Sequence, residues 1–143
     1  MPAIIAAGHA FERATTGRKA RALKVTALRD YLIDEVMKGV PGAILMGDRR
    51  HRVPINAAFV FPGVDADYLA ILMDREGVAV TPRSACLGSG GARADVAYAL
   101  TGDEALSRAM IRFSLSSQTT QKEVLGAVRV LLACLPKARA FDR

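Results

Sequence analysis

The residues Met110-Ile-Arg-Phe-Ser-Leu115 place an apolar side chain at every second position from Ile111 onward. This alternation predicts a strand that turns one face toward a hydrophobic core. Arg112 stands in the middle of that strand, on the face opposite to Ile111 and Phe113. A charged guanidinium inside an apolar strand must be paired or must face a ligand, and arginine is well suited to gripping a carboxylate. The other interpretation is an arginine on the polar, outward side of the strand, and both stay open here.

A helix is expected directly downstream of this strand. Thr120-Gln-Lys-Glu123 has the pattern of a capping box, which opens a helix that we expect to run to Pro136. Its apolar stripe consists of Val124, Val128, Leu131, Leu132 and Leu135. Cys134 lies on the side of this stripe and is expected in the core.

Upstream, glycines, prolines and changes of apolar period divide the chain into further elements. Helices are expected over residues 2–16, 18–38, 65–76 (with Asp65 as its cap) and 94–100, and a further turn starts at Asp103. Strands are expected over residues 43–46, 55–61 and 78–80, with a polar loop over 47–52. The order predicts one α/β (α+β) domain over residues 1–143, with an open sheet of about four short strands and helices packed on one face.

The length and composition of the chain favour a single compact domain over a membrane or exported protein. With 143 residues, 51% of them hydrophobic, the chain suits one compact domain. It has no apolar run of membrane-spanning length, and its start lacks the basic region of a signal peptide, so neither a membrane nor an export role is expected. Two cysteines do not make a disulfide framework, which favours a reducing, cytoplasmic setting.

The chain is basic, with a net charge of +6 and a pI near 9.8. Such a charge fits nucleic acid, an acidic protein partner or a merely solvated surface. The basic residues are spread along the chain, there is no tryptophan, and aromatic residues do not alternate with them. This pattern favours a solvated surface, and no nucleic-acid partner is expected.

The strongest candidate for chemistry is the cysteine in Val80-Thr-Pro-Arg-Ser-Ala-Cys86-Leu-Gly-Ser-Gly-Gly91. A loop so rich in glycine is expected to stay mobile, so that its thiol could be carried from one place to another. The expected loop residues around Cys86 are Arg83, Ser84, Ala85, Leu87, Gly88, Ser89 and Gly90. The alternative is that Cys86 is a small buried apolar residue, as most free cysteines are.

Other cysteine chemistry has less support. Cys86 and Cys134 are 48 positions apart (134 − 86) and form no ligand pair with a histidine, so no metal site is expected. A Cys–His hydrolase with His9 or His51 as the base is possible in principle. The spacing gives it no support, and both histidines are expected on the surface.

Three stretches together resemble a known family: Phe61-Pro-Gly-Val-Asp65, Arg83-Ser-Ala-Cys86, and Ile111-Arg-Phe-Ser-Leu115 followed by Thr119-Thr120. In this order and spacing they resemble the C-terminal small domain of cysteine desulfurases, which are pyridoxal-phosphate enzymes of the class V aminotransferase family. The resemblance covers nearly the whole chain and implies a mainly antiparallel sheet, as in the small domain of fold-type I enzymes. The spacing of 26 from Cys86 to Arg112 (112 − 86) resembles the group with the longer cysteine loop.

The resemblance implies roles for these residues. Cys86 would take the sulfur of L-cysteine as a persulfide with release of alanine, and Arg112 would hold the substrate carboxylate. The sulfur would then pass to an acceptor or scaffold protein for iron–sulfur cluster or thio-cofactor assembly. A selenocysteine lyase, or another class V lyase, would show the same motifs. A non-catalytic interaction module that keeps the fold is the alternative from a different class.

The chain also departs from the family. The lysine that binds pyridoxal phosphate follows a Ser-His pair in the family, and Lys19, Lys24, Lys38, Lys122 and Lys137 all lack that setting. The phosphate-binding large domain of the family is also expected to be absent. We therefore expect no cofactor on this chain alone, little activity alone and a separate cofactor-domain chain as a possible partner. Ile4, Ile5 and Phe11 are expected to be left exposed on the first helix, which favours homo-oligomers.

Overall fold

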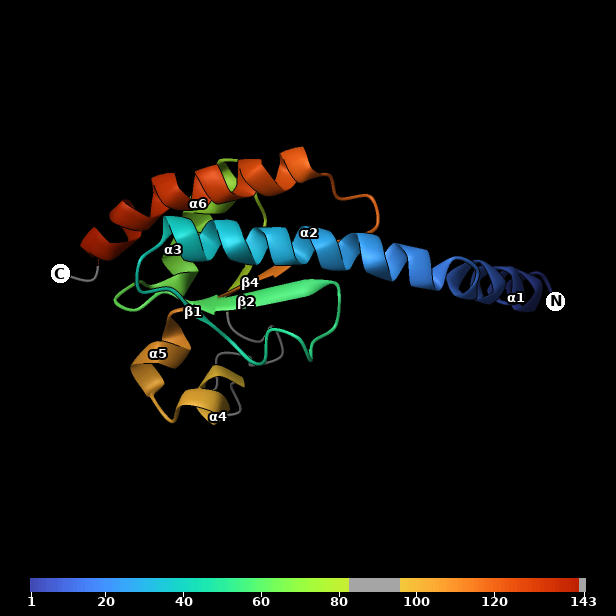
Figure 1. Ribbon diagram of the computed structural model, residues 1–143, viewed down its shortest axis with the longest axis horizontal. Coiled ribbons are helices and arrows are strands. Elements are labelled where there is room, and N and C mark those ends of the chain that lie inside the picture. Colours follow the sequence, from blue (N-terminus) through green and yellow to red (C-terminus); the bar gives the residue numbers. More distant parts are fainter. Residues whose placement is uncertain (83–95, 142–143) are drawn as a thin grey trace.

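The computed structural model describes residues 1–82 and 96–141 (Figure 1). In chain order the elements are α1 (Pro2–Thr15), α2 (Arg18–Gly39), β1 (Ile44–Leu45), β2 (Asn56–Val60), α3 (Ala66–Arg75), β3 (Thr81–Pro82), α4 (Val96–Thr101), α5 (Glu104–Arg108), β4 (Met110–Ser114) and α6 (Gln121–Phe141). In these residues the predicted order of helices and strands is confirmed, but the third strand lies at other residues than expected and the last helix ends later, as given below.

The strands form one four-stranded sheet in the order β1-β2-β4-β3, and every neighbouring pair is antiparallel. The longest ladder joins β2 to β4 over five residue pairs, from Asn56↔Ser114 to Val60↔Met110. This confirms the predicted small, open, antiparallel sheet. Since β4 lies between β2 and β3, its backbone is held from both sides at Arg112.

One expected strand is wrong. Residues 78–80 were expected to form the third strand, but the strand that pairs with β4 is Thr81–Pro82. The N–H of Val78 donates to the carbonyl of Met73 at the end of α3, and Gly77 turns the chain with a φ of 81°. Residue 78 is thus bonded to the preceding helix, and the ladder starts later.

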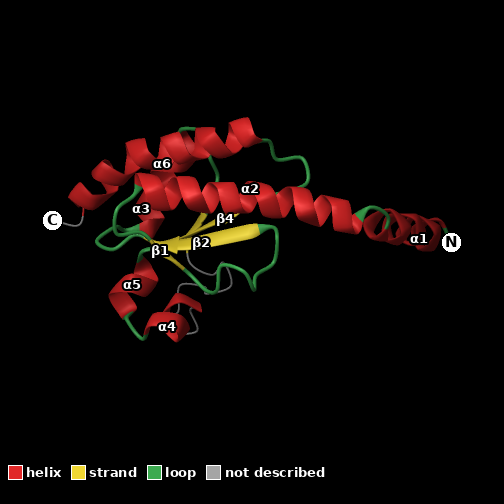
Figure 2. Cartoon of the chain, in the orientation of Figure 1, coloured by secondary structure: helices red, strands yellow, loops and turns green. Residues whose placement is uncertain are grey.

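The main core lies between one face of the sheet and the helices α2, α3 and α6 (Figure 2). From the sheet it receives Phe59, Ile111 and Phe113, and the rings of Phe59 and Phe113 meet edge to face at 6.0 Å. Leu32 and Leu131 are among the buried residues that α2 and α6 contribute. The alternation that defined the strand from Met110 therefore places its apolar face as predicted.

The other face of the sheet carries a smaller layer. The short helices α4 and α5 lie on that side (Figure 1), where Ala97, Met110, Val60 and Met46 form a second buried cluster. Arg112 points to this side as well, because it alternates with Ile111 and Phe113. Helices α2, α3 and α6 occupy the single face expected for the helices, and the layer of α4 and α5 is an addition to it.

Capping residues behave as their sequence patterns predict. The Asp65 carboxylate accepts a hydrogen bond from the N–H of Tyr68 at 2.8 Å. At the start of α6, Glu123 accepts from the N–H of Thr120 at 2.7 Å, while the Thr120 hydroxyl accepts from the N–H of Glu123. The bonds that the Thr120 N–H and hydroxyl donate to the carboxylate lower the pKa of Glu123, because they favour its charged form.

The end of α6 differs from the expectation. The helix continues through Pro136 to Phe141, although proline removes a helix hydrogen bond and crowds the preceding turn. Pro136 lies on the exposed side of α6, whereas Leu135 and Ala138 are buried. Packing of those two residues therefore holds the last turns onto the core.

Helix α1 stands apart from this packing. It contains no buried residue and extends α2 away from the sheet (Figure 1). Ile4, Ile5 and Phe11 are 72%, 61% and 74% exposed, as the sequence predicted for this helix. Among the described residues, no helix combines the length and apolar character needed to cross a membrane.

Candidate functional site

Arg112 lies at the centre of the sheet, where β4 is flanked on both sides. It stands opposite Ala58 on β2 and Thr81 on β3. The residue is half-buried, and its Nε is buried with no hydrogen-bond partner among the described residues. A buried donor without a partner costs free energy. The arginine is therefore not the fully solvated side chain of the second interpretation, and no group in the described residues accepts a hydrogen bond from its Nε.

The strand beside Arg112 leads into the cysteine-bearing segment. Thr81 pairs with Arg112 and Pro82 with Ile111, and Arg83 follows directly. Cys86 and the expected loop residues Arg83, Ser84, Ala85, Leu87, Gly88, Ser89 and Gly90 lie outside the described residues. The next described element is α4, whose Ala97 shares the small cluster with Met110 on the Arg112 side. Both described ends of the segment thus adjoin the face that carries Arg112.

The second cysteine belongs to the core, as predicted. Cys134 on α6 is 3% exposed and is a free thiol. Burial raises its pKa, with a smaller opposing contribution from Lys137. A neutral buried thiol is a poor nucleophile, so Cys134 is a packing residue.

The two histidines are exposed, as expected. His9 lies on α1 with Nδ1 3.8 Å from Glu12, and His51 Nδ1 lies 3.1 Å from the carboxylate of Asp48. Neither is drawn into the core. In the part of the chain that the structure describes, no three residues of the types His, Cys, Asp and Glu are grouped to hold a metal ion.

A network of arginines escaped the sequence analysis. Arg29 on α2 is 3% exposed, and it donates to the carboxylate of Asp30 at 2.7 Å and to the carbonyl of Val53 at 3.0 Å. Arg52 donates to the carbonyls of Met46 and Asp48, each at 2.8 Å. The bond from Arg29 to Val53 ties the loop before β2 to α2, and the bonds of Arg52 close the loop upon itself. The signal available was the position of Arg29, four residues after the buried Val25 on the same helix.

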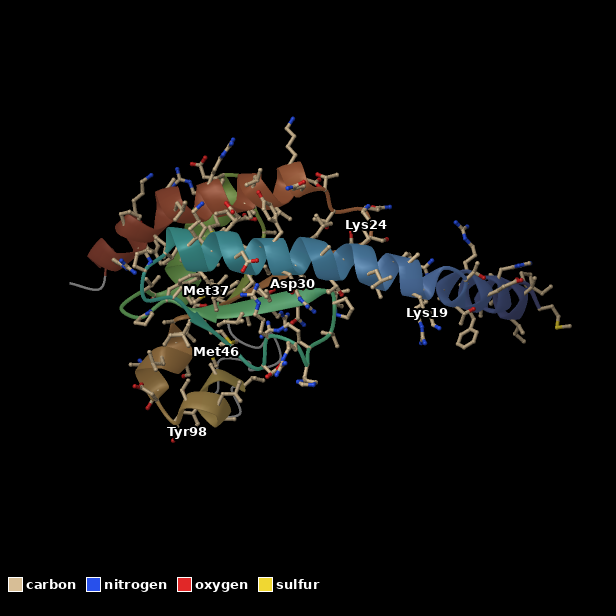
Figure 3. All side chains as sticks on the ribbon, viewed as in Figure 1. Lys19, Lys24, Asp30, Met37, Met46 and Tyr98 are labelled. Atoms are coloured by element: carbon tan, nitrogen blue, oxygen red, sulfur yellow. The ribbon has the colours of Figure 1, made fainter. Side chains whose placement is uncertain are left out.

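The lysines do not provide a pyridoxal-phosphate site. All five lie exposed on α2 or α6, and Lys19 and Lys24 sit on the part of α2 that extends away from the sheet (Figure 3). Lys24 donates to the carbonyl of Ser117 at 2.8 Å. A lysine that forms a stable link to the cofactor needs an enclosed setting that lowers its pKa. The described residues therefore do not fit the cofactor.

Comparison with known proteins gives a consistent picture. The family model for class-V aminotransferases matches residues 1–126. A cysteine desulfurase IscS of Dictyoglomus turgidum is 34% identical over 139 residues, which is 97% of this chain and 35% of the relative. One from Anaeromyxobacter sp. strain K is 35% identical over 142 residues, again covering 35% of the relative. The chain thus spans about a third of the length of the curated relatives it matches.

A solved structure shows the same fold. The chain of a NifS-like protein superposes with a TM-score of 0.78 at 24% identity, covering 95% of this chain and 34% of that one. At this identity the likeness supports the arrangement of strands and helices only.

Proposed function

The chain belongs to the class-V aminotransferase family, and we propose that it is the small, sulfur-accepting domain of a cysteine desulfurase. Curated relatives that cover nearly the whole of this chain carry that name. The observation that carries the proposal is Arg112, a half-buried arginine with a free Nε beside the strand that leads to Cys86.

Arg112 is proposed to bind the carboxylate of L-cysteine. Its backbone is fixed by β2 and β3, so the guanidinium starts from a rigid base. A carboxylate would satisfy the unpartnered Nε with a charge-assisted hydrogen bond, which is stronger than a neutral one. The Met110 and Ala58 side chains on the same face would leave the arginine little water to compete with the substrate.

Cys86 is proposed to receive the sulfur. The net reaction joins the Cys86 thiol and the thiol sulfur of L-cysteine in a new S–S bond, while the carbon–sulfur bond of the substrate breaks and alanine is released. Both sulfur atoms end in the persulfide, and the substrate carbon gains the hydrogen. Cys86 follows Pro82 by four residues, and four residues span at most about 14 Å. That reach makes a shared site with Arg112 possible.

Pyridoxal phosphate is proposed to come from elsewhere. The complete enzymes of this family use it, and the relatives are about three times as long as this chain. A separate chain with the cofactor domain is the proposed partner, together with a protein that takes up the sulfur for iron–sulfur cluster or thio-cofactor assembly. The exposed apolar residues Ile4, Ile5 and Phe11 of α1 are proposed to be covered in that assembly or in a homo-oligomer.

Persulfide transfer tests the proposal directly. The purified chain is mixed with a complete cysteine desulfurase and radiolabelled L-cysteine, and the label is mapped on peptides. We expect reducible label on Cys86 that is lost in Cys86→Ser and kept in Cys134→Ser. No label on the chain, or equal label in Cys86→Ser, would reject the sulfur-accepting role.

A further inference from the structure

The ladder between β3 and β4 stops early and leaves an opening in the sheet. It contains the pairs Thr81↔Arg112 and Pro82↔Ile111. Continuing the same register would set Ala79 against Ser114 and Val78 against Leu115. These residues do not pair in the described sheet. Instead, they line opposite sides of a groove of about 580 Å³, which is within the range of binding pockets, roughly 300–1,000 Å³.

The backbone of Ser114 is aimed into this groove. The N–H of Leu115 donates to the carbonyl of Ile55, toward β2. Successive residues of a strand direct their N–H and C=O groups to alternate sides. Ser114 therefore directs its backbone groups to the β3 side, where the described ladder offers it no partner. Such an unpaired edge is a template for another strand.

The floor of the groove is apolar. Helix α6 supplies Val124, Ala127 and Val130, and Phe113 and Leu115 on β4 also line it. A strand entering here would place alternate side chains on this floor and the others toward solvent. The groove thus suits an extended segment with an apolar residue at every second position.

The charged residues of the groove indicate the charge of the segment that would bind there. The chain as a whole is basic, with 20 lysine and arginine residues against 14 aspartate and glutamate residues. The charged residues lining the groove are nevertheless both acidic, Glu76 and Glu123. A partner with a positive charge at the end of its apolar stretch would complement them.

We propose that the groove between residues 77–79 and 113–116 binds an extended segment of a partner polypeptide, apolar at alternate residues and basic at its ends, by strand addition to Ser114. The backbone groups of Ser114 would supply the strand hydrogen bonds, and side-chain contacts with α6 would supply specificity. This surface is independent of Arg112, which does not line the groove.

Two glycines make a matched test. Gly126 lines the groove, and a Cβ added there meets no atom within 4 Å. A leucine at this helix position would start from an unobstructed Cβ and add an apolar side chain at the groove. Gly8 on α1 is also helical with nothing within 4 Å of an added Cβ, so Gly8→Leu controls for the same substitution outside the groove.

The probe is a seven-residue peptide that alternates valine and threonine between terminal lysines, added to the isotope-labelled full chain and followed by nuclear magnetic resonance. We expect saturable shifts at the amides of Ser114 and Ser116. The affinity should fall at least about ten-fold in Gly126→Leu and stay unchanged in Gly8→Leu. The paired substitution Glu76→Gln with Glu123→Gln, which keeps a capping side chain at 123, should weaken it several-fold.

Three results would overturn the proposal. The first is equal binding of a peptide with terminal glutamates, since the acidic lining would then select nothing. The second is full affinity in Gly126→Leu while thermal melting shows that the variant is folded. The third is an absence of shifts at millimolar peptide. Shifts at these amides when the chain alone is concentrated would also overturn it, because they would assign the groove to a second copy of the chain.

Discussion

The two faces of β4 differ in how completely they are covered. On one face Ile111 and Phe113 are sealed beneath α2, α3 and α6. On the other, Arg112 is half-buried beside a small cluster, and its Nε has no hydrogen-bond partner in residues 1–82 and 96–141. Adjacent residues of β4 thus lie in different environments. The covered face contributes stability, and the face of Arg112 is the one on which we propose that a ligand binds.

Thiol reactivity is expected to show the largest difference between the two sides. Cys134 lies in the covered core with a raised pKa, so it reacts only when the fold opens. Cys86 follows the strand beside Arg112, and we expect it to be accessible. Native alkylation followed by peptide mapping should modify Cys86 more than about a thousand times faster than Cys134, given the opening energies typical of core positions. If Cys134 is labelled first, the carrier function of Cys86 is wrong.

Truncation on the covered face should cost stability. Phe113→Ala removes a 5% exposed ring that contacts Phe59, and losses of about 3–5 kcal/mol are usual for such cavities. Ser114→Ala, on the next residue and exposed, should change the free energy of unfolding by less than about 0.5 kcal/mol. Urea unfolding of both variants checks this, and equal losses would mean that the two faces do not differ.

Substitution of Arg112 should leave stability nearly intact and change binding. Arg112→Gln removes the charge and the guanidinium while keeping a polar side chain with an N–H donor. In enzyme reconstituted with a cofactor-domain chain, the KM for L-cysteine should rise about 10- to 100-fold, the range expected for a lost hydrogen bond to a charged group. Arg108→Gln is the control, since Arg108 is exposed on α5 and pairs with Glu104. A rise in KM of the same size in Arg108→Gln would remove the special role of Arg112.

The smallest effect should come from the helix that closes the covered face. The pKa of Glu123 is lowered by its bonds from Thr120. A carboxylate with a lowered folded pKa adds stability above its unfolded pKa and loses it as pH falls through the folded value. The stability advantage of the native chain over Glu123→Ala should therefore shrink when urea unfolding is repeated below pH 4.5, the ordinary value for this group. An advantage that does not change with pH would contradict the assignment.

The elements of the covered face could be predicted from the sequence, because their buried residues recur at regular spacing. The alternation from Ile111 and the capping box at Thr120 were sufficient to place β4 and α6. The strand expected at 78–80 was not found, because local propensity carries no information on the bond from Val78 to Met73. The helix end expected at Pro136 was also wrong, because the sequence does not show that burial of Ala138 outweighs the cost of a proline inside the helix.

The site was predictable only in part. Arg112 was singled out because a charge interrupts an apolar strand, and its two interpretations could be separated only by burial and hydrogen bonding. Arg29 was overlooked, since its partner carbonyl on Val53 is 24 residues away along the chain. A contact between residues so far apart in the sequence depends on the path of the loop before β2, and local sequence patterns do not predict that path.

The junction between α1 and α2 is a point about which α1 can turn as a rigid arm. Gly17 adopts a left-handed φ of 69°, and the Arg21 guanidinium bonds across the junction to the carbonyl of Thr16 at 2.6 Å. The 14 residues of α1 make an arm of about 21 Å at 1.5 Å per residue. Turning that arm by roughly 10° about Gly17 would move its tip through about 4 Å, roughly two thirds of the rise of one helical turn. A change in one backbone angle is thereby amplified into a large displacement of the exposed apolar residues near the tip.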